Sequence, residues 1–99
     1  MLNITKNAEN NTLTIALDGR LDTITAPQLE EELQKSLDGI SALILDLEKL
    51  EYISSAGLRV FLSTQKKMNG QGEMKVVRPG ETVMEIFEVT GFSDILTIE

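Results

Sequence analysis

The sequence contains no cysteine and no histidine. Without cysteine, disulfide bonds, thiolate nucleophiles and cysteine metal sites are all excluded. Without histidine, the chain lacks the commonest general base and the commonest metal ligand, so a hydrolytic site built on a serine is hard to assemble. Nothing in the sequence indicates a metal, a nucleotide or any other cofactor.

Basic residues are few. The chain has 9 Lys and Arg against 16 Asp and Glu, a net charge of -7. Nucleic-acid affinity comes largely from Lys and Arg that replace counterions, and no basic cluster here is longer than Lys66-Lys67. We therefore expect no nucleic-acid partner. A protein partner with a basic face is favoured instead.

Long hydrophobic runs are also missing. Residues 1–6 lack the apolar core of a signal peptide, and no run approaches the ~20 apolar residues of a membrane span. We expect a soluble, cytoplasmic protein with no membrane contact. At 99 residues, with no repeat, linker or low-complexity segment, the chain is predicted to form one domain over residues 1–99.

The most informative stretch covers residues 43–62. The near-continuous apolar run at residues 43–47 predicts a buried strand in the centre of a sheet. Residues 48–53 are then predicted to be a short link. A helix follows that begins at Ser54 and Ser55, either of which can cap its unpaired N–H groups. The same position leaves a hydroxyl at the surface.

The first third of the chain predicts a hairpin followed by a helix. Alternating apolar residues predict two strands around an asparagine-rich turn at residues 7–11, and residues 19–24 predict a loop. A cap at Thr25 and a proline in the first turn then open a helix. Its predicted buried stripe consists of Leu29, Leu33 and Leu37.

The last third predicts a strand over residues 74–77, a helix over residues 81–89 capped by Gly91, and a short strand over residues 96–98. The alternation of strands and helices predicts an α/β fold with a mostly parallel or mixed sheet and crossover helices lying on it. Right-handed crossovers would place Ser55 at the carboxyl end of the central strand, where open α/β sheets carry functional loops.

The two serines have a structural and a functional interpretation. The structural one is that they cap a helix and do nothing more. The functional one starts from Gly57, which in a first helical turn costs about 1 kcal/mol relative to alanine and, with Ala56, leaves room for another protein to approach. Because a helix amino terminus tolerates phosphate, phosphorylation of Ser55 would add roughly two negative charges to a contact surface without unfolding the domain.

Three segments resemble a known family. Residues 46–58, with the sequence DLEKLEYISSAGL, resemble the phosphorylation motif of STAS domains, specifically of the bacterial anti-sigma factor antagonists. Residues 19–26, with GRLD followed by TA, resemble a second signature of that family, and residues 86–92, with IFEVTGF, resemble its last helix and turn. The resemblance covers essentially the whole chain. It implies a STAS-like mixed sheet of four to five strands with helices packed mainly on one side.

The resemblance also implies a partner-switching regulator of transcription. In such families the unphosphorylated antagonist binds an anti-sigma factor that is also a serine kinase, which releases the sigma factor to RNA polymerase. The kinase then phosphorylates the antagonist and frees itself, and a PP2C-type phosphatase resets the cycle. Aligned on the family motif, the phosphoserine falls on Ser55, and a position that often holds aspartate falls on Ser54.

The resemblance assigns further contact residues. Gly57, Leu58 and Arg59 would belong to the docking edge of the helix, and Asp22 would lie near the serine and help present it. From the residues alone, Asp22 is equally explained as a turn aspartate that bonds nearby backbone. Leu58 is also explained as a core residue, and Arg59 as a solvated charge.

Two other functions stay open at this point. A STAS accessory subunit of a lipid-transport or transporter complex would bind its partner without phosphorylation. A small hydrolase would use Ser55 as its nucleophile, but it needs a base, and only Lys49, Lys66 or Lys67 can be suggested. We therefore expect a protein that is not an enzyme.

Overall fold

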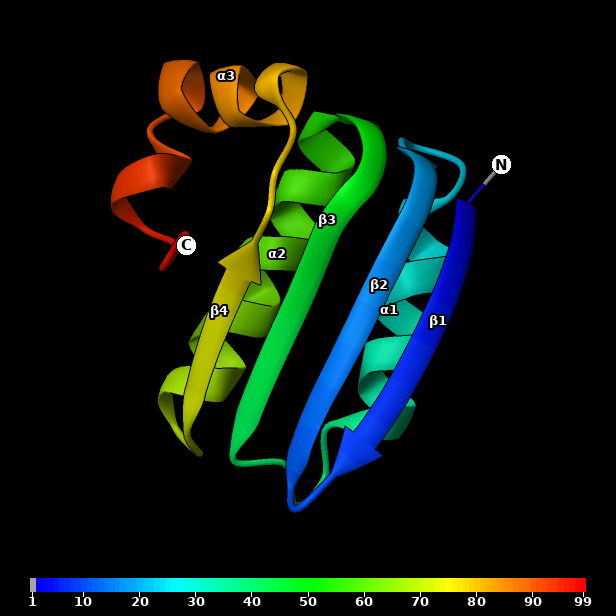
Figure 1. The fold of residues 1–99 in the computed structure, drawn as a ribbon, viewed down its shortest axis with the longest axis vertical. Coiled ribbons are helices and arrows are strands. Elements are labelled where there is room, and N and C mark those ends of the chain that lie inside the picture. Colours follow the sequence, from blue (N-terminus) through cyan, green and yellow to red (C-terminus); the bar gives the residue numbers. More distant parts are fainter. Residues whose placement is uncertain (1) are drawn as a thin grey trace.

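The computed structural model describes residues 2–99 as a four-stranded sheet with helices against one face (Figure 1). Met1, part of the amino-terminal segment considered above, lies outside the described residues. The elements in chain order are β1 (Leu2–Glu9), β2 (Thr12–Leu21), α1 (Ala26–Ser36), β3 (Ala42–Ile53), α2 (Ser55–Asn69), β4 (Glu73–Val77), α3 (Glu81–Thr90) and the 3₁₀ turn η1 (Phe92–Asp94). The predicted α/β class is confirmed.

The sheet is mixed, with strand order β1-β2-β3-β4. β1 runs antiparallel to β2, whereas β2 with β3 and β3 with β4 are parallel. β3 therefore lies inside the sheet, as its apolar run predicted. No helix within residues 2–99 is long and apolar enough to cross a membrane.

The hairpin turn is tighter than predicted. Only Asn10 and Asn11 form it, with φ of 53° and 65°, in the left-handed region that asparagine tolerates. Residues 7–9, which were predicted to belong to the turn, stay in β1, and Glu9 pairs with Thr12. Polar side chains there are accommodated because β1 is an edge strand exposed to solvent.

The two segments predicted as loops on either side of the site are largely strand. Residues 48–53 continue β3, and residues 19–21 continue β2, so both predictions are wrong there. These two extensions pair with each other, Gly19 with Leu50 and Leu21 with Ile53, across register irregularities. Both connections to the helices consequently leave the same edge of the sheet, the upper edge in Figure 1.

The core lies between the sheet and the helices. Alternate residues of β2 and β3 point into it, and the predicted stripe of α1 is buried there. On α2, Leu58 is buried, which agrees with its interpretation as a core residue; Phe61 is buried beside it, and Leu62 is half-buried. The Phe61 ring lies 6.2 Å from the Phe87 ring of α3, so the aromatic pair joins the two helices.

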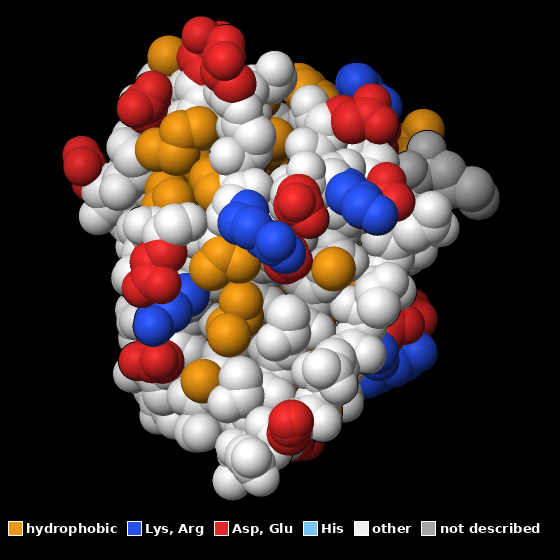
Figure 2. Space-filling view, in the orientation of Figure 1, with side chains coloured by type: hydrophobic (Ala, Val, Ile, Leu, Met, Phe, Trp, Pro, Cys, Tyr) orange, Lys and Arg blue, Asp and Glu red, His pale blue; other side chains and the backbone are white. Residues whose placement is uncertain are grey.

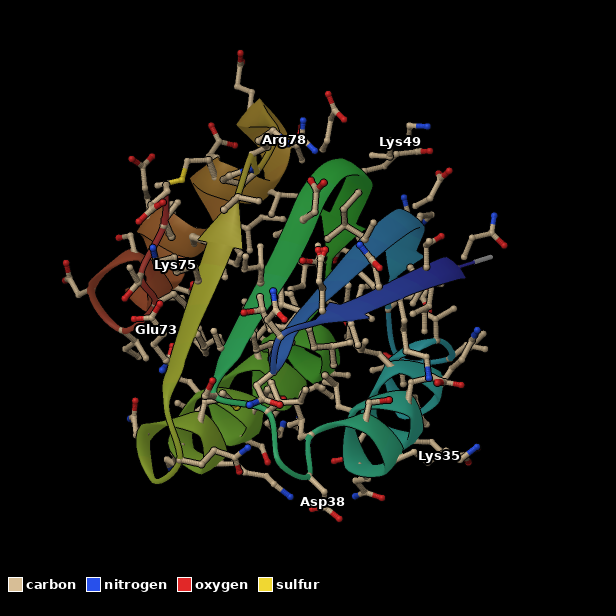
Figure 3. All side chains as sticks on the ribbon, turned by 60° about the horizontal axis from the view of Figure 1, so that its bottom comes forward. Lys35, Asp38, Lys49, Glu73, Lys75 and Arg78 are labelled. Atoms are coloured by element: carbon tan, nitrogen blue, oxygen red, sulfur yellow. The ribbon has the colours of Figure 1, made fainter. Side chains whose placement is uncertain are left out.

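The other face of the sheet is left uncovered by the helices of the described chain (Figures 1 and 2). An ion-pair cluster lies there: the Arg78 guanidinium bonds both carboxylate oxygens of Asp46 and lies 3.6 Å from Glu48. The hydrogen bonds from Arg78 hold the pKa of Asp46 below its usual value. Arg78 follows β4 directly, as Figure 3 shows, so the cluster ties β3 to the connection that leads to α3.

The carboxyl-terminal segment agrees with the sequence only in part. Gly91 ends α3 with a φ of 82°, which confirms the predicted glycine cap. The predicted strand over residues 96–98 is not formed. A single parallel bridge joins Ile98 to Val76 instead.

Gly57 lets α2 approach the sheet closely. Its backbone is buried, and a β-carbon built there would lie 2.7 Å from Cγ of Leu21 and 2.9 Å from Cγ1 of Ile53. Both distances are too short for a methyl group. The bare backbone of Gly57 therefore faces the interior, which corrects its interpretation as open surface for a partner.

We predict that Gly57→Ala lowers the free energy of unfolding by roughly 1–2 kcal/mol. Overpacking against Leu21 and Ile53 costs about 1–3 kcal/mol, and the better helix propensity of alanine returns at most about 1 kcal/mol. Urea unfolding measures the change. Gly70→Ala is the matched control, because its β-carbon would meet only the Lys67 carbonyl, at 3.5 Å. Equal stabilities for Gly57→Ala and the wild type would contradict this packing.

Candidate functional site

The two adjacent serines have different positions and different roles. Ser54 is the N-cap of α2, with extended backbone, and its hydroxyl oxygen accepts the N–H of Gly57 at 3.4 Å. Ser55 is the first residue of α2, and it is exposed. The sequence allowed either serine to be the cap. In the structure Ser54 has that role, which leaves the Ser55 hydroxyl at the surface.

A backbone bond fixes the start of α2 against β2. The N–H of Ser54 donates to the carbonyl of Leu21 at 2.8 Å. Leu21 is paired with Ile53 in the parallel ladder, so this bond extends the ladder past the end of both strands. It also holds the start of the β2–α1 connection, where Asp22 follows Leu21, close to the backbone of Ser54.

Asp22 organises its own connection. Its Oδ1 accepts the backbone N–H groups of Ile24 and Thr25, each at 3.0 Å, and lies 3.2 Å from the Thr25 hydroxyl. These are the bonds of the turn-aspartate alternative. The Thr25 hydroxyl also bonds backward, to the Arg20 carbonyl at 2.9 Å, and makes no cap bond to α1. Thr25 does occupy the predicted N-cap position of α1, but the predicted cap bond is not formed, because its side chain bonds the turn instead of the helix.

The hydrogen bonds to Asp22 favour its charged form. The backbone N–H of Thr25 is the largest cause that lowers the pKa of this carboxyl below its usual value of 3.8, and partial burial opposes it. The N–H of Ile24, the Thr25 hydroxyl and the positive charge of Arg20 lower the pKa further. Asp22 is therefore ionised at neutral pH.

A groove lies beside Ser55, between the first turns of α1 and α2. It has a volume of about 310 Å³ and an apolar lining from Ala26, Pro27, Ala56 and Val60. Two charged side chains also line it, Glu30 from α1 and Arg59 from α2. Arg59 is exposed, as expected of a residue on the outer face of the helix.

Ile24 is a feature that the sequence analysis missed. Its side chain is 86% exposed on the β2–α1 connection, although isoleucine is among the residues most often buried. The available signal was an apolar residue between two threonines in a predicted loop. By contrast, Gly57 and Leu58 lie beneath the surface, so any contribution they make to docking is through the position of the turn above them.

The fold and the site together define a small α/β domain in which one edge of the sheet carries two helix starts, an exposed serine and a groove. Within residues 2–99, no group of three or more Asp and Glu side chains is arranged to hold a metal ion. The chain belongs to the STAS domain family, whose sequence profile matches residues 3–99.

Two of the proteins to which this chain is similar are named anti-sigma factor antagonists. The chain is 37% identical to a putative anti-sigma factor antagonist, BtrV of Bordetella bronchiseptica, over 98% of this chain and 85% of the relative. A crystal structure of an anti-sigma factor antagonist from Mycobacterium paratuberculosis superposes with a TM-score of 0.90 at 23% identity, covering 99% of this chain and 85% of that one. At that identity the superposition establishes the shared fold.

A third relative has been solved in two chemical states. The anti-sigma factor antagonist SpoIIAA in its unphosphorylated form superposes with a TM-score of 0.84 at 19% identity, covering 98% of this chain and 88% of SpoIIAA. The Bacillus protein in its phosphorylated form gives a TM-score of 0.75 at 18% identity, covering 100% of this chain and 91% of that one. The fold described here is thus shared with both forms.

We predict that Asp22→Asn destabilises the protein at pH 7 but not at pH 2. The carboxylate has a lowered pKa in the folded state, so its contribution is present above the ordinary value of 3.8 and is lost as the pH falls through the folded value. Urea unfolding of both proteins from pH 7 to pH 2 measures the difference. Asp38→Asn, which removes the same charge from an exposed loop, is the control. A difference that stays constant with pH would contradict a role for the charge of Asp22.

Proposed function

We propose that this STAS domain, over residues 1–99, is a cytoplasmic anti-sigma factor antagonist that works by partner switching and is controlled by phosphorylation of Ser55. The observation that carries the proposal is the exposed hydroxyl of Ser55 at the first position of α2, next to a neighbour that already caps the helix. Because Ser54 makes the cap bond, Ser55 is free to be modified without loss of the helix start. The names of the relatives support the same function.

The proposed partner is an anti-sigma factor with serine kinase activity. It would bind the unphosphorylated protein at the edge formed by Ser54, Ser55 and Arg59 of α2 together with Asp22 and Ile24 of the β2–α1 connection. Ile24 offers apolar area that is open to water in the isolated chain, and the neighbouring groove offers more. Gly57 and Leu58 contribute from beneath by holding the turn in place.

Phosphorylation would reverse this binding. The transfer forms a bond between Ser55 Oγ and the γ-phosphorus of ATP and breaks the bond to the bridging oxygen, so that ADP leaves and the hydroxyl proton passes to the kinase. The phosphate adds about -1.5 to -2 charges at the first turn of α2. The dipole of α2 tolerates that charge, whereas an apolar or acidic partner surface does not. A PP2C-type phosphatase would restore the hydroxyl by transferring the phosphoryl group to water.

We predict that Ser55→Ala abolishes phosphorylation by the kinase from the same genome and leaves partner affinity within about twofold, because an exposed hydroxyl is removed without a change of fold. Ser55→Asp should weaken binding roughly tenfold, about 1.4 kcal/mol, through its added charge. Mass spectrometry after incubation with ATP measures phosphorylation, and calorimetry measures affinity.

Two serine variants serve as controls. Ser41→Ala removes an exposed hydroxyl from the segment before β3, away from the groove, and should not change phosphorylation. Ser54→Ala should keep the phosphoacceptor while costing about 1 kcal/mol of stability through loss of the cap. Undiminished phosphorylation of Ser55→Ala would contradict the proposed site. Tight binding of a transporter-associated protein, with no phosphorylation at all, would favour a STAS accessory subunit instead.

A further inference from the structure

Arg59 differs from the other two arginines of the chain. The guanidinium of Arg20 lies 4.6 Å from the centre of the Tyr52 ring, and that of Arg78 pairs with Asp46 and Glu48. Arg59 is exposed, and within residues 2–99 its guanidinium has neither a carboxylate partner nor an aromatic ring beneath it. Within the described residues Arg59 is thus a cation available to bind an anion, on a protein whose net charge is -7.

The position of Arg59 relative to Ser55 is set by the helix. The two residues are four apart in α2 and both are exposed, so they lie on one face with β-carbons about 6 Å apart. Side chains on a helix lean toward its amino terminus, which carries the guanidinium of Arg59 toward Ser55. An anion placed amino-terminal to a cation at this spacing is the favourable order. A guanidinium can also bond two phosphate oxygens at once.

We propose that Arg59 forms an ion pair with a phosphate on Ser55. In the unphosphorylated protein, Arg59 is instead available to bind an acidic group of the partner. Phosphorylation therefore removes this cation from the docking edge. This inference rests on the proposed phosphorylation of Ser55. The phosphate then acts twice. It adds negative charge to the docking edge, and it pairs with Arg59, whose positive charge lines the groove.

Two acidic groups near this edge favour pairing along α2, and Arg20 of β2, the other cation close to Asp22, has its guanidinium against the Tyr52 ring. Asp22 on the β2–α1 connection and Glu30 on α1 are both acidic, and each repels a phosphate that turns toward it. Lys66 and Lys67 lie on the last turns of α2, about 10 Å or more along the axis beyond Arg59. Arg59 is therefore the cation of α2 within reach of Ser55.

The ion pair is tested without a kinase, in protein with phosphoserine incorporated genetically at position 55. The second pKa of phosphoserine is ordinarily about 6, and a nearby cation lowers it by stabilising the dianion. In ³¹P NMR titrations, Arg59→Gln should raise this pKa by about 0.3 pH units or more, the size expected of one such pair. Arg59→Lys should raise it less, and Lys66→Gln, which removes the same charge farther along α2, should leave it unchanged.

Two results of the titration would overturn the ion pair. One is the same phosphoserine pKa in the wild type and in Arg59→Gln. The other is an equal rise in Arg59→Gln and Lys66→Gln, which would reflect overall charge alone. A second spectroscopic readout is the side-chain N–H resonance of Arg59, which should move on phosphorylation of the wild type. No movement would count against the pair.

The consequence for the partner is tested by calorimetry with the anti-sigma factor. Arg59→Gln should weaken binding of the unphosphorylated protein severalfold and reduce the ratio of affinities between the unphosphorylated and phosphorylated forms. An unchanged ratio would overturn the inference while leaving the proposed function intact. If Arg59→Gln changes the phosphoserine pKa but the kinase never phosphorylates Ser55, the ion pair stands and the proposed function is overturned.

Discussion

The parallel pairing of β2 with β3 is the constraint on which the site depends. It holds as far as Leu21 and Ile53, and the bond from the Ser54 N–H to the Leu21 carbonyl carries it one residue further. Because both strands end at the same edge, the starts of α1 and α2 emerge side by side. Gly57 then allows α2 to lie directly against these strand ends. The exposure of Ser55 is thus fixed by residues more than thirty positions earlier in the chain.

The two helix starts at this edge are stabilised by different means. On the α1 side, Asp22 and Thr25 bond each other and the surrounding backbone, so the connection is rigid before the helix begins. On the α2 side, a single serine hydroxyl caps the helix. Capping and accessibility are thereby assigned to neighbouring residues, Ser54 and Ser55. The capping bond of Ser54 does not use the hydroxyl of Ser55.

The sequence predicted the helices, the interior strand, the glycine cap at Gly91 and the place of the serines. It failed at residues 19–21 and 48–53, because polar side chains on an uncovered sheet face have the composition of a loop, and only the pairing partner identifies them as strand. At Thr25 and Gly57 the residue type indicated a special role, but the groups that each one contacts could not be predicted, since tertiary structure determines those contacts. The exposure of Ile24 and the groove could not be predicted from the sequence, because both depend on how segments distant in sequence pack together.

The crossover between β2 and β3 also affects how the chain folds. Leu21 and Ile53 are joined only after the intervening segment, including α1, has been closed into a loop, and contacts of such long sequence separation form late and slowly. The edge that presents Ser55 is therefore absent as long as β2 and β3 are not paired. A protein that recognises this edge would therefore bind only chains in which this pairing has formed.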